Sequence, residues 1–348
     1  MTTLTLYHNP QSRSASARVL LEALGVDYTV VPLDFATGQT RTPEFLAINP
    51  LGKLPTLVHG DAVVTEQVAI TIYLADRFPD AGLAPAFDHP LRGPYLRWLA
   101  FYAACFEPAL VDHAYQRAPL EPSASPYRDY QTVIDVLVAQ LARGDYLLGD
   151  TLTAADLLWG TALTWTTGFG IVPKLPVITD YMARVARHPA VARAGELDAA
   201  QALLLTTTAG YGFIASLGDL EAGNRNGKAV LTVPEGAQVL PPLKLADVAT
   251  LSLAVLSSAG RLLVFAAADL PRLSKGKGNK LMNLDAGEGE RIVRVLALAA
   301  GDKLTVHAGA RRMTLTSKDI EHYRGERARR GQKLPRGFQR VDDITVAP

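Results

Sequence analysis

The first 80 residues alternate between short apolar runs and stretches with helical spacing. Apolar residues that recur every three or four positions predict a helix, and short apolar runs between turn residues predict strands. Gly25 follows the first helical stretch, where a glycine commonly ends a helix. The predicted elements are, in order, a strand at 4–7, a helix at 14–24, strands at 28–34, 54–58 and 62–65, and a helix at 66–78. This order predicts one small mixed sheet covered by helices.

From residue 90 to about residue 200 the pattern is helical throughout. Apolar residues recur at spacings of three and four, and no strand pattern competes with them. Thr153 and Asp156 stand at the spacing of a helix N-cap and its reciprocal partner, just before an apolar run. Residues 88–200 are therefore predicted to form an all-α domain.

After residue 203 the pattern changes to β-branched and apolar alternation with glycine turns, and it repeats. Each repeat has a turn, an apolar strand and an Asp-Leu or Asp-Ile pair, and the aspartates, Asp219, Asp269 and Asp319, are spaced by 50 residues. Each repeat then enters a glycine-rich basic loop, and these loops are 224–228, 274–280 and 327–333. Such a period with several short strands is typical of propeller blades. Residues 203–348 are therefore predicted to be an all-β partial propeller of about three blades.

Length and composition fit a chain of several domains. The chain has 348 residues, 48% of them hydrophobic, which is enough for more than one buried core. Its single cysteine, Cys105, excludes an internal disulfide and a cysteine-rich metal site, and no metal is expected. The first residues lack the pattern of a signal peptide, and no apolar run reaches the ~20 residues of a membrane helix. We expect a cytoplasmic protein without membrane contact.

Charge is distributed unevenly along the chain, although its net value is only +1. Residues 201–348 carry 21 Lys and Arg against 14 Asp and Glu, whereas residues 1–200 carry 14 against 20. An acidic first part and a basic second part suggest different partners for the two.

The segment INPLGKLPTLVHGDAVVTEQVAITIYLADRFP (48–79) gives the first part a specific interpretation. With this motif, residues 1–200 resemble a bacterial glutathione S-transferase, with a thioredoxin-like domain at 1–82 and the helical domain at 88–200. The resemblance implies a homodimeric detoxification enzyme that joins glutathione, its substrate, to a small electrophile. It also implies the residues that bind glutathione, which are Lys53, Leu54, Pro55, Glu66 and Gln67.

The resemblance also implies how these residues act. The residue before a cis-proline, Leu54, would bond the peptide backbone of glutathione, and Glu66 and Gln67 would bind its γ-glutamyl end. Family members often carry Ser where Gln67 stands, so the chain departs from the pattern at this position.

The proposed chemistry requires a thiolate at neutral pH, whereas a free thiol has a pKa of ~8.5. A hydroxyl donor at a helix N-terminus can stabilise the charged sulfur. Ser12, in NPQSRSASARVLL, precedes the first predicted helix, and serine-type transferases carry a serine two positions after this proline. Ser12 is thus the candidate catalytic residue, and Ser14 is the second choice.

Other residues of this part keep alternative roles. Tyr7 would be the activator in a tyrosine-type enzyme, but its position predicts the end of the first strand. Arg13 stands where a cysteine-type bacterial subclass carries its Cys, which disfavours that subclass. Three aromatic side chains are candidates for an acceptor pocket, although core packing is the simpler role: Tyr102, Trp159 and Trp165.

The basic loops of the second part do not match a nucleotide-binding motif. GNRNGKA has one residue too few between its glycines and ends in Ala, and KGKGNKL lacks the hydroxyl that would bind magnesium. Readers of single strands need aromatic residues among the cations, and these loops contain none, so duplex DNA is the expected partner. The candidate DNA-binding residues are Lys275, Lys277, Lys280, Arg329, Arg330 and Lys333.

The second part also resembles a known family. The segments AGYGF, NRNGKAVLTVPEGAQVLPPL, GRLLVFAAADLPRLSKGKGNKL and GERARRGQKLPRGFQRVD are similar to the end of the C-terminal domain of the A subunit of DNA topoisomerase IV, a relative of the gyrase A subunit. The resemblance implies an open propeller whose basic rim contacts bent duplex DNA. Nothing corresponds to the DNA-cleaving domain of that family, so topoisomerase activity is not expected.

These patterns together predict a glutathione transferase fused to a truncated, DNA-binding fragment of a topoisomerase subunit. The alternative is a nonenzymatic DNA-binding protein in which the transferase part serves as a dimerising scaffold. The departure at Gln67 permits this alternative.

Overall fold

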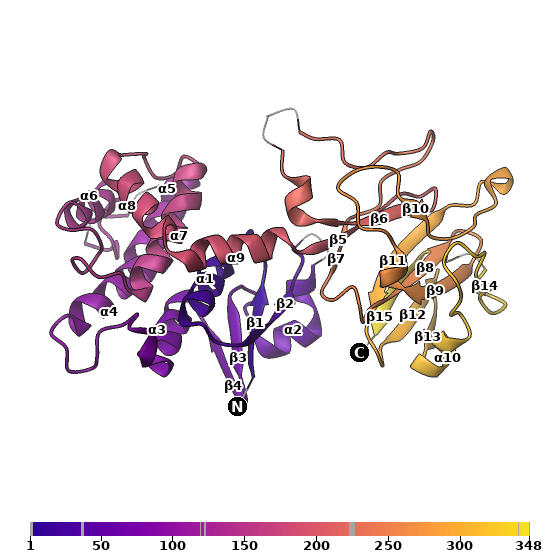
Figure 1. The fold of residues 1–348 in the computed structure, drawn as a ribbon, viewed down its shortest axis with the longest axis horizontal. Helices are drawn as coiled ribbons and strands as arrows, with labels where there is room; N and C mark the ends of the chain where they lie inside the picture. The colour runs from indigo at the N-terminus through magenta and orange to yellow at the C-terminus, as the bar shows by residue number, and fades with distance from the viewer. Residues whose placement is uncertain are drawn as a thin grey trace. The chain divides into compact units, whose positions relative to one another are not determined.

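The chain forms two compact units, Met1–Glu196 and Leu197–Pro348 (Figure 1). The structure is a computed structural model, and it describes residues 3–35, 38–118, 120–121, 123–222, 227–339 and 341–347. Within these ranges no helix is both long and apolar enough to cross a membrane.

The first unit contains a four-stranded mixed sheet. Its strands are β1 (Leu4–His8), β2 (Tyr28–Pro32), β3 (Thr56–His59) and β4 (Ala62–Thr65), in the order β2-β1-β3-β4. β1 and β2 are parallel, and β3 is antiparallel to both β1 and β4. β3 begins at Thr56 rather than at residue 54, because Pro55 has no N–H for the ladder. The Leu54–Pro55 peptide bond is cis.

Helices cover this sheet and build the rest of the first unit, and the last of them, α9, continues past Glu196 (Figure 1). They are α1 (Ser14–Leu24), α2 (Pro43–Ile48), α3 (Gln67–Arg77), α4 (Arg92–Phe101), α5 (Glu107–Ala114), α6 (Tyr130–Leu141), α7 (Ala154–Gly168), α8 (Pro176–Ala186) and α9 (Pro189–Ala199). A π-helical turn, Tyr102–Phe106, joins α4 to α5. Gly25 ends α1 with φ +63°, and Thr153 and Asp156 form the capping box of α7. The architecture predicted for residues 1–200 is confirmed.

The second unit consists of three small sheets that repeat one plan. Each sheet is built on a hairpin: β5 (Ala202–Thr206) with β6 (Tyr211–Ser216), β8 (Ser252–Ser257) with β9 (Arg261–Ala266), and β12 (Lys303–Ala308) with β13 (Arg311–Leu315). The first strand of each hairpin also pairs with a later strand, which is β7 (Leu243–Leu245), β11 (Ile292–Leu298) or β15 (Asp343–Ala347).

The three repeat aspartates lie at equivalent places after the hairpins. Asp219 and Asp269 lie in 3-10 turns, and Asp319 lies in the short helix α10 (Ser317–Glu321). Asp219 and Asp319 both accept a hydrogen bond from the backbone N–H three residues earlier, as capping-box residues do. The predicted 50-residue repeat is therefore confirmed.

Neighbouring repeats are joined by an exchanged strand. β10 (Asn279–Lys280), from the loop of the second repeat, completes the first sheet, and β14 (Gln332–Lys333), from the loop of the third repeat, completes the second sheet. Two of the predicted basic loops are thus also structural elements. In the loop of the first repeat, residues 224–226 lie outside the described residues.

A glycine lets each exchanged strand approach its acceptor. Gly278 has φ +75°, and a Cβ at this position would overlap the backbone carbonyl of Gly212. Gly331 has φ +72°, and a Cβ there would lie 2.7 Å from the carbonyl oxygen of Leu262. Both positions therefore need a left-handed backbone and leave no room for a side chain.

The two outer faces of the repeat array differ in polarity. On the first sheet the outer face is apolar, and Phe213 is buried beneath Leu220 and Leu231 of the segment that follows the hairpin. On the third sheet the outer face carries threonines, and the hydroxyl oxygens of Thr305 and Thr314 lie 3.2 Å apart. The array thus ends in a covered apolar face and in a polar face.

We expect Gly278→Ala to loosen the exchanged strand. The added methyl must displace β10 from Gly212 and also holds a strained backbone, which together cost about 2 kcal/mol or more. Hydrogen exchange of the β6 and β10 amides should therefore accelerate by roughly 10- to 100-fold. Gly287→Ala is the control, because the one atom near its Cβ is a carboxylate oxygen of Asp285 at 3.5 Å. Equal protection in the two variants would contradict the steric account.

Candidate functional site

Three segments of the first unit meet at one edge of the sheet. Tyr7, near the end of β1, lies opposite Thr56 at the start of β3, and Thr56 lies opposite Thr65 at the end of β4. The segments that continue from these strand ends carry the predicted glutathione residues: Ser12 after β1, Lys53 to Pro55 before β3, and Glu66 and Gln67 after β4. The strand register therefore brings all of them to the same edge.

The two candidate serines have different surroundings. Ser12 is half-buried, and its hydroxyl donates to the carbonyl oxygen of Asn9 at 2.8 Å. Ser14 is fully buried, and its Oγ lies 2.8 Å from His8 Nδ1 and accepts a hydrogen bond from the Asn9 N–H at 3.0 Å. The two hydroxyl oxygens are 2.7 Å apart. Of the two, only Ser12 is accessible to a ligand, and Ser14 holds the loop to the end of β1.

The turn before β3 is held by backbone and apolar contacts. The carbonyl oxygen of Lys53 accepts a hydrogen bond from Asn49 Nδ2 at 3.0 Å, while the Lys53 side chain is exposed. Leu54 packs in a small apolar cluster with Tyr7 and Phe45, whose ring centres lie 5.3 Å apart. Tyr7 thus completes β1 and contributes to packing.

Glu66 and Gln67 mark the start of α3. Glu66 is exposed, with φ +66°, and it directly precedes the free N–H groups of the helix N-terminus. Gln67 is buried, and its Nε2 donates to Ser16 Oγ at 2.5 Å, which ties α3 to α1. Its Oε1 has no hydrogen-bond partner among the described residues.

Arg13, the residue after Ser12, forms an ion pair with α5. Its Nε donates to Glu107 Oε1 at 2.5 Å, and the same oxygen accepts a hydrogen bond from the Tyr102 hydroxyl at 2.7 Å. Burial raises the pKa of Tyr102 well above its usual value, so the hydroxyl keeps its proton. Burial alone would lower the pKa of Arg13, but the Glu107 carboxylate outweighs it and raises the pKa. The guanidinium is therefore a permanent cation beside the candidate thiol site.

A cavity of about 160 Å³ opens beside this ion pair, between α5 and α7. Its walls are largely apolar and are formed by Arg13, Phe106, Glu107, Leu110, Val111, Ala114, Tyr115, Trp165, Thr166 and Ile171. Trp165 is the candidate aromatic residue that lines this cavity. Trp159 is fully buried, with its ring centre 4.6 Å from that of Phe106 and 5.2 Å from that of Tyr102, and it belongs to the core.

The lysines of the second unit are exposed or half-exposed. Lys275, Lys277 and Lys333 have exposed side chains, and Lys280 Nζ lies 3.4 Å from the amide oxygen of Asn283. Across the described ranges, none of these four lysines lies within ion-pair distance of a carboxylate. Their charges are thus available to an anionic partner.

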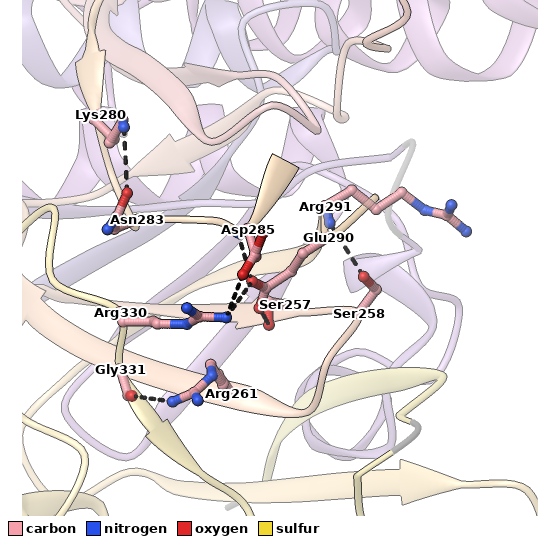
Figure 2. A network of polar contacts seen from close by, with 10 residues as sticks. All are labelled: Ser257, Ser258, Arg261, Lys280, Asn283, Asp285, Glu290, Arg291, Arg330 and Gly331. Atoms are coloured by element: carbon pink, nitrogen blue, oxygen red, sulfur yellow. Dashed lines mark hydrogen bonds and ion pairs between the residues drawn. The ribbon is translucent and has the colours of Figure 1, made fainter. Parts of the chain in front are cut away.

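The two candidate arginines, in contrast, are paired within the unit. Arg329 forms an ion pair with Glu326 at 2.6 Å. Arg330 donates to Asp285 Oδ2 at 3.2 Å and lies 3.8 Å from the buried carboxylate of Glu290 (Figure 2). Both arginines are thus paired with carboxylates, whereas the four lysines of the predicted set have no carboxylate partner among the described residues.

The structure also places an aromatic residue, Tyr211, beside the lysines of the second basic loop, although the loop sequences contain no aromatic residue. Lys277 Nζ lies 3.8 Å from the ring centre of Tyr211, and Lys280 Nζ lies 5.9 Å from it. Tyr211 belongs to β6, about 70 residues before these lysines, so the loop sequence alone could not reveal it. The strand exchange itself did have a sequence signal. The two segments that form exchanged strands are alike, GNKL at 278–281 and GQKL at 331–334.

No group of three or more His, Cys, Asp and Glu side chains in the described part of the chain could hold a metal ion.

Comparison with known proteins assigns the first unit. Residues 2–76 match the family "Glutathione S-transferase, N-terminal domain", and residues 123–189 match "Glutathione S-transferase, C-terminal domain". Glutathione S-transferase 3 of Zea mays is 35% identical over 168 residues, which cover 45% of this chain and 75% of that protein. A solved glutathione transferase from Methylococcus capsulatus is 30% identical, with 56% of this chain and 98% of that chain covered and a TM-score of 0.48.

The second unit matches a different family. Residues 201–241 and 252–299 match "DNA gyrase C-terminal domain, beta-propeller". The A subunit of DNA topoisomerase 4 of Pseudomonas aeruginosa is 46% identical over 147 residues, which cover 41% of this chain but only 20% of that protein. The chain therefore spans about a fifth of the length of this relative. It belongs to the glutathione S-transferase family, and it joins the two domains of that family to a propeller region like that at the C-terminus of the topoisomerase IV A subunit.

Proposed function

We propose that the first unit binds glutathione and activates its thiol for attack on small electrophiles, as in detoxification by conjugation. The observation that carries this proposal is the meeting of Ser12, the Leu54–Pro55 turn and Glu66 at one sheet edge. Each of the three supplies a different contact for a short peptide that carries an anionic sulfur.

Glutathione would extend along this edge from its sulfur to its γ-glutamyl end. The backbone of Leu54 would pair with the peptide groups, and Lys53 would lie near the same part of the ligand. The carboxylate of Glu66 would attract the ligand's ammonium group, and the N-terminus of α3 would attract its carboxylate. Gln67 would support this site by its bond to Ser16.

Ser12 would stabilise the thiolate at the start of α1. Its O–H donates to Asn9 in this structure, so it would turn from that carbonyl to the sulfur. The turn replaces a neutral hydrogen bond by one to an anion, and bonds to ions are about twice as strong. The N-terminus of α1 would add a favourable dipole.

We expect Ser12→Ala to slow conjugation of a generic aromatic halide by roughly 10²-fold, because the thiolate loses one oriented donor. Steady-state turnover measures the rate, and ultraviolet absorbance of bound glutathione as a function of pH measures the thiol pKa, which should rise. Unchanged turnover would remove Ser12 from the mechanism.

We expect Ser14→Ala to act on stability. The change leaves the buried Asn9 N–H without its acceptor, which costs about 1–3 kcal/mol. Tryptophan fluorescence during urea unfolding reports this unit alone, since Trp98, Trp159 and Trp165 all belong to it. Ser12→Ala is the matched control and should cost less, because Ser12 is half-exposed. If both variants unfold alike, the distinction between the serines is wrong.

A second function, binding of duplex DNA, is favoured by the four lysines that have no carboxylate partner in the described part of the chain. We propose that Lys275, Lys277, Lys280 and Lys333 contact phosphates, and that Arg329 and Arg330 contribute less because each is already paired.

The full proposal is a cytoplasmic homodimer with domains at 1–82, 88–200 and 203–348.

The rival is a nonenzymatic DNA-binding protein with the first unit as a dimerising scaffold. Calorimetric titration with glutathione distinguishes the transferase hypothesis from this rival, because a scaffold without a working glutathione site would release no heat of binding.

Loss of the three lysines of the second basic loop should flatten the salt dependence of DNA binding. Each phosphate contact contributes about −0.9 to the log–log slope, so changing Lys275, Lys277 and Lys280 to Ala should lower its magnitude by about 2–3. Arg329→Ala, which removes a cation already bound by Glu326, is the matched control and should change it less. Fluorescence anisotropy of a labelled duplex between low and moderate salt gives both slopes. A slope near zero for the unmodified protein would refute the proposal.

A further inference from the structure

The third sheet of the second unit lacks a strand that the other two sheets have. The first and second sheets have four strands each, and in each the exchanged strand pairs with the second strand of the hairpin, β6 or β9. The third sheet has three strands in the order β13-β12-β15, so among the described residues the edge of β13 away from β12 has no partner. An exchanged strand occupies the corresponding edge in the other two sheets.

Backbone hydrogen bonds show the same difference. The N–H of Ile214 donates to the carbonyl oxygen of Pro271 at 2.9 Å, and the N–H of Val264 donates to that of Tyr323 at 2.8 Å. In both cases the acceptor belongs to the following repeat. Thr314 stands 50 residues after Val264 and has no such bond within the described ranges. The backbone of β13 is thus open to a further strand.

The first repeat carries a segment that resembles the two exchanged strands. Gly278 and Gly331 precede these strands with φ +75° and +72°, and Gly227 of the first basic loop has φ +74°. A Cβ at Gly278 or Gly331 would meet the acceptor strand, whereas a Cβ at Gly227 would have no described atom within 4 Å. The next two residues, Lys228 and Ala229, are exposed and lie in no strand. Residues 227–230 therefore have the backbone of a donor segment without its acceptor.

We propose that the donor segment, residues 227–230, of one copy of this chain pairs with β13 of a second copy. Strand addition of this kind gains its affinity from main-chain hydrogen bonds. Because each copy has one donor and one acceptor, two copies can join by a reciprocal exchange about a twofold axis. The joint needs neither glutathione nor DNA, so it is independent of both proposed functions.

The two exchanged strands give the register of this joint. In both, the second residue after the glycine lies opposite the first residue of the acceptor strand. Ala229 would therefore lie opposite Arg311, and Lys228 would lie opposite the next residue of β13. The joint brings cations together, but the second sheet already does so, since Lys333 lies opposite Arg261.

The exchange adds a strand and not a whole repeat. The outer face of the third sheet carries Thr305 and Thr314, so another sheet would find no apolar surface to pack on. A strand at the edge of β13 bonds through backbone N–H and C=O groups and does not need an apolar face.

Disulfide trapping between two co-expressed, differently tagged chains tests the joint. Both chains carry Cys105→Ser, which removes the one native cysteine, and one also carries Ala229→Cys and the other Arg311→Cys. Opposed residues of antiparallel strands have Cα atoms about 4.5–5.5 Å apart, which suits a disulfide.

We expect the doubly tagged protein, purified without glutathione or DNA and oxidised with diamide, to form the 229–311 disulfide. Mass spectrometry of the joined peptides identifies it. The control pairs Ala229→Cys with Thr314→Cys, which lies about 10 Å further along the strand. The joint should raise the rate of disulfide formation over this control by roughly 10-fold or more, because pairing gives the two sulfurs a high effective concentration.

A matched pair of glycine variants tests the donor segment. Gly227 and Gly236 are both exposed, have φ +74° and +73°, and would each place a Cβ in open space. Valine strains the backbone equally at the two positions, but only Gly227 lies in the donor segment. Gly227→Val should therefore lower trapping to the level of the control pair, whereas Gly236→Val should leave it unchanged. Circular dichroism confirms that each variant is folded.

Three results would overturn the proposal. The first is a 229–311 disulfide that forms no faster than the control disulfide. The second is equal trapping in the Gly227→Val and Gly236→Val chains, because the donor backbone would then have no role. The third comes from hydrogen exchange of chains without added cysteines, in which the β13 amides should exchange roughly 10-fold more slowly in the unmodified protein than in Gly227→Val. Equal exchange would mean that the donor segment does not cover this edge.

Discussion

Ladder pairing between β1, β3 and β4 decides where the candidate site of the first unit lies. Because Tyr7, Thr56 and Thr65 lie side by side, the chain segments beyond these residues must open at one sheet edge. A slip of one residue in any strand would turn its side chains to the other face and separate the segments. The helices then complete the site, since α1 and α3 begin at this edge and the Gln67–Ser16 bond joins them.

In the second unit, the strand Asn279–Lys280 both completes a neighbouring sheet and carries a cationic side chain. Asn279–Lys280 uses its backbone to complete the sheet of the preceding repeat, and the Lys280 side chain extends from that strand toward Tyr211. Backbone pairing and side-chain charge do not compete, because ladder bonds use only N–H and C=O groups. Both depend on Gly278, because a side chain at this position would prevent the strand from approaching Gly212 of β6.

Local patterns allowed much of the fold to be predicted. The helix at 14–24, the strand at 62–65 and the cap at Thr153 depend on neighbouring residues, so their sequence suffices to predict them. The strand exchange could not be predicted in this way, because which strand a short basic loop pairs with depends on contacts with another repeat.

The same limit applies to the sites. That Ser12 and Glu66 belong to one site could be predicted, because both stand in a family motif whose residues follow one another in a known order. The bond from Arg13 to Glu107 spans 94 residues, and the pairing of Arg330 with Asp285 spans 45, and no spacing rule predicts either. Charge counts treated all the cations of the loops as equal. The structure separates arginines that are paired with carboxylates from four lysines that have no carboxylate partner among the described residues.

The two ends of the repeat array differ, and each opposes the addition of another repeat. Another repeat placed before β5 would first have to displace Leu220 and Leu231, which already occupy the apolar face it would need. Another repeat placed after β15 would meet a surface of threonines, against which no apolar core could form. The array therefore resists further stacking at one end by occupancy and at the other by chemistry, which allows three repeats to stand without a neighbouring blade.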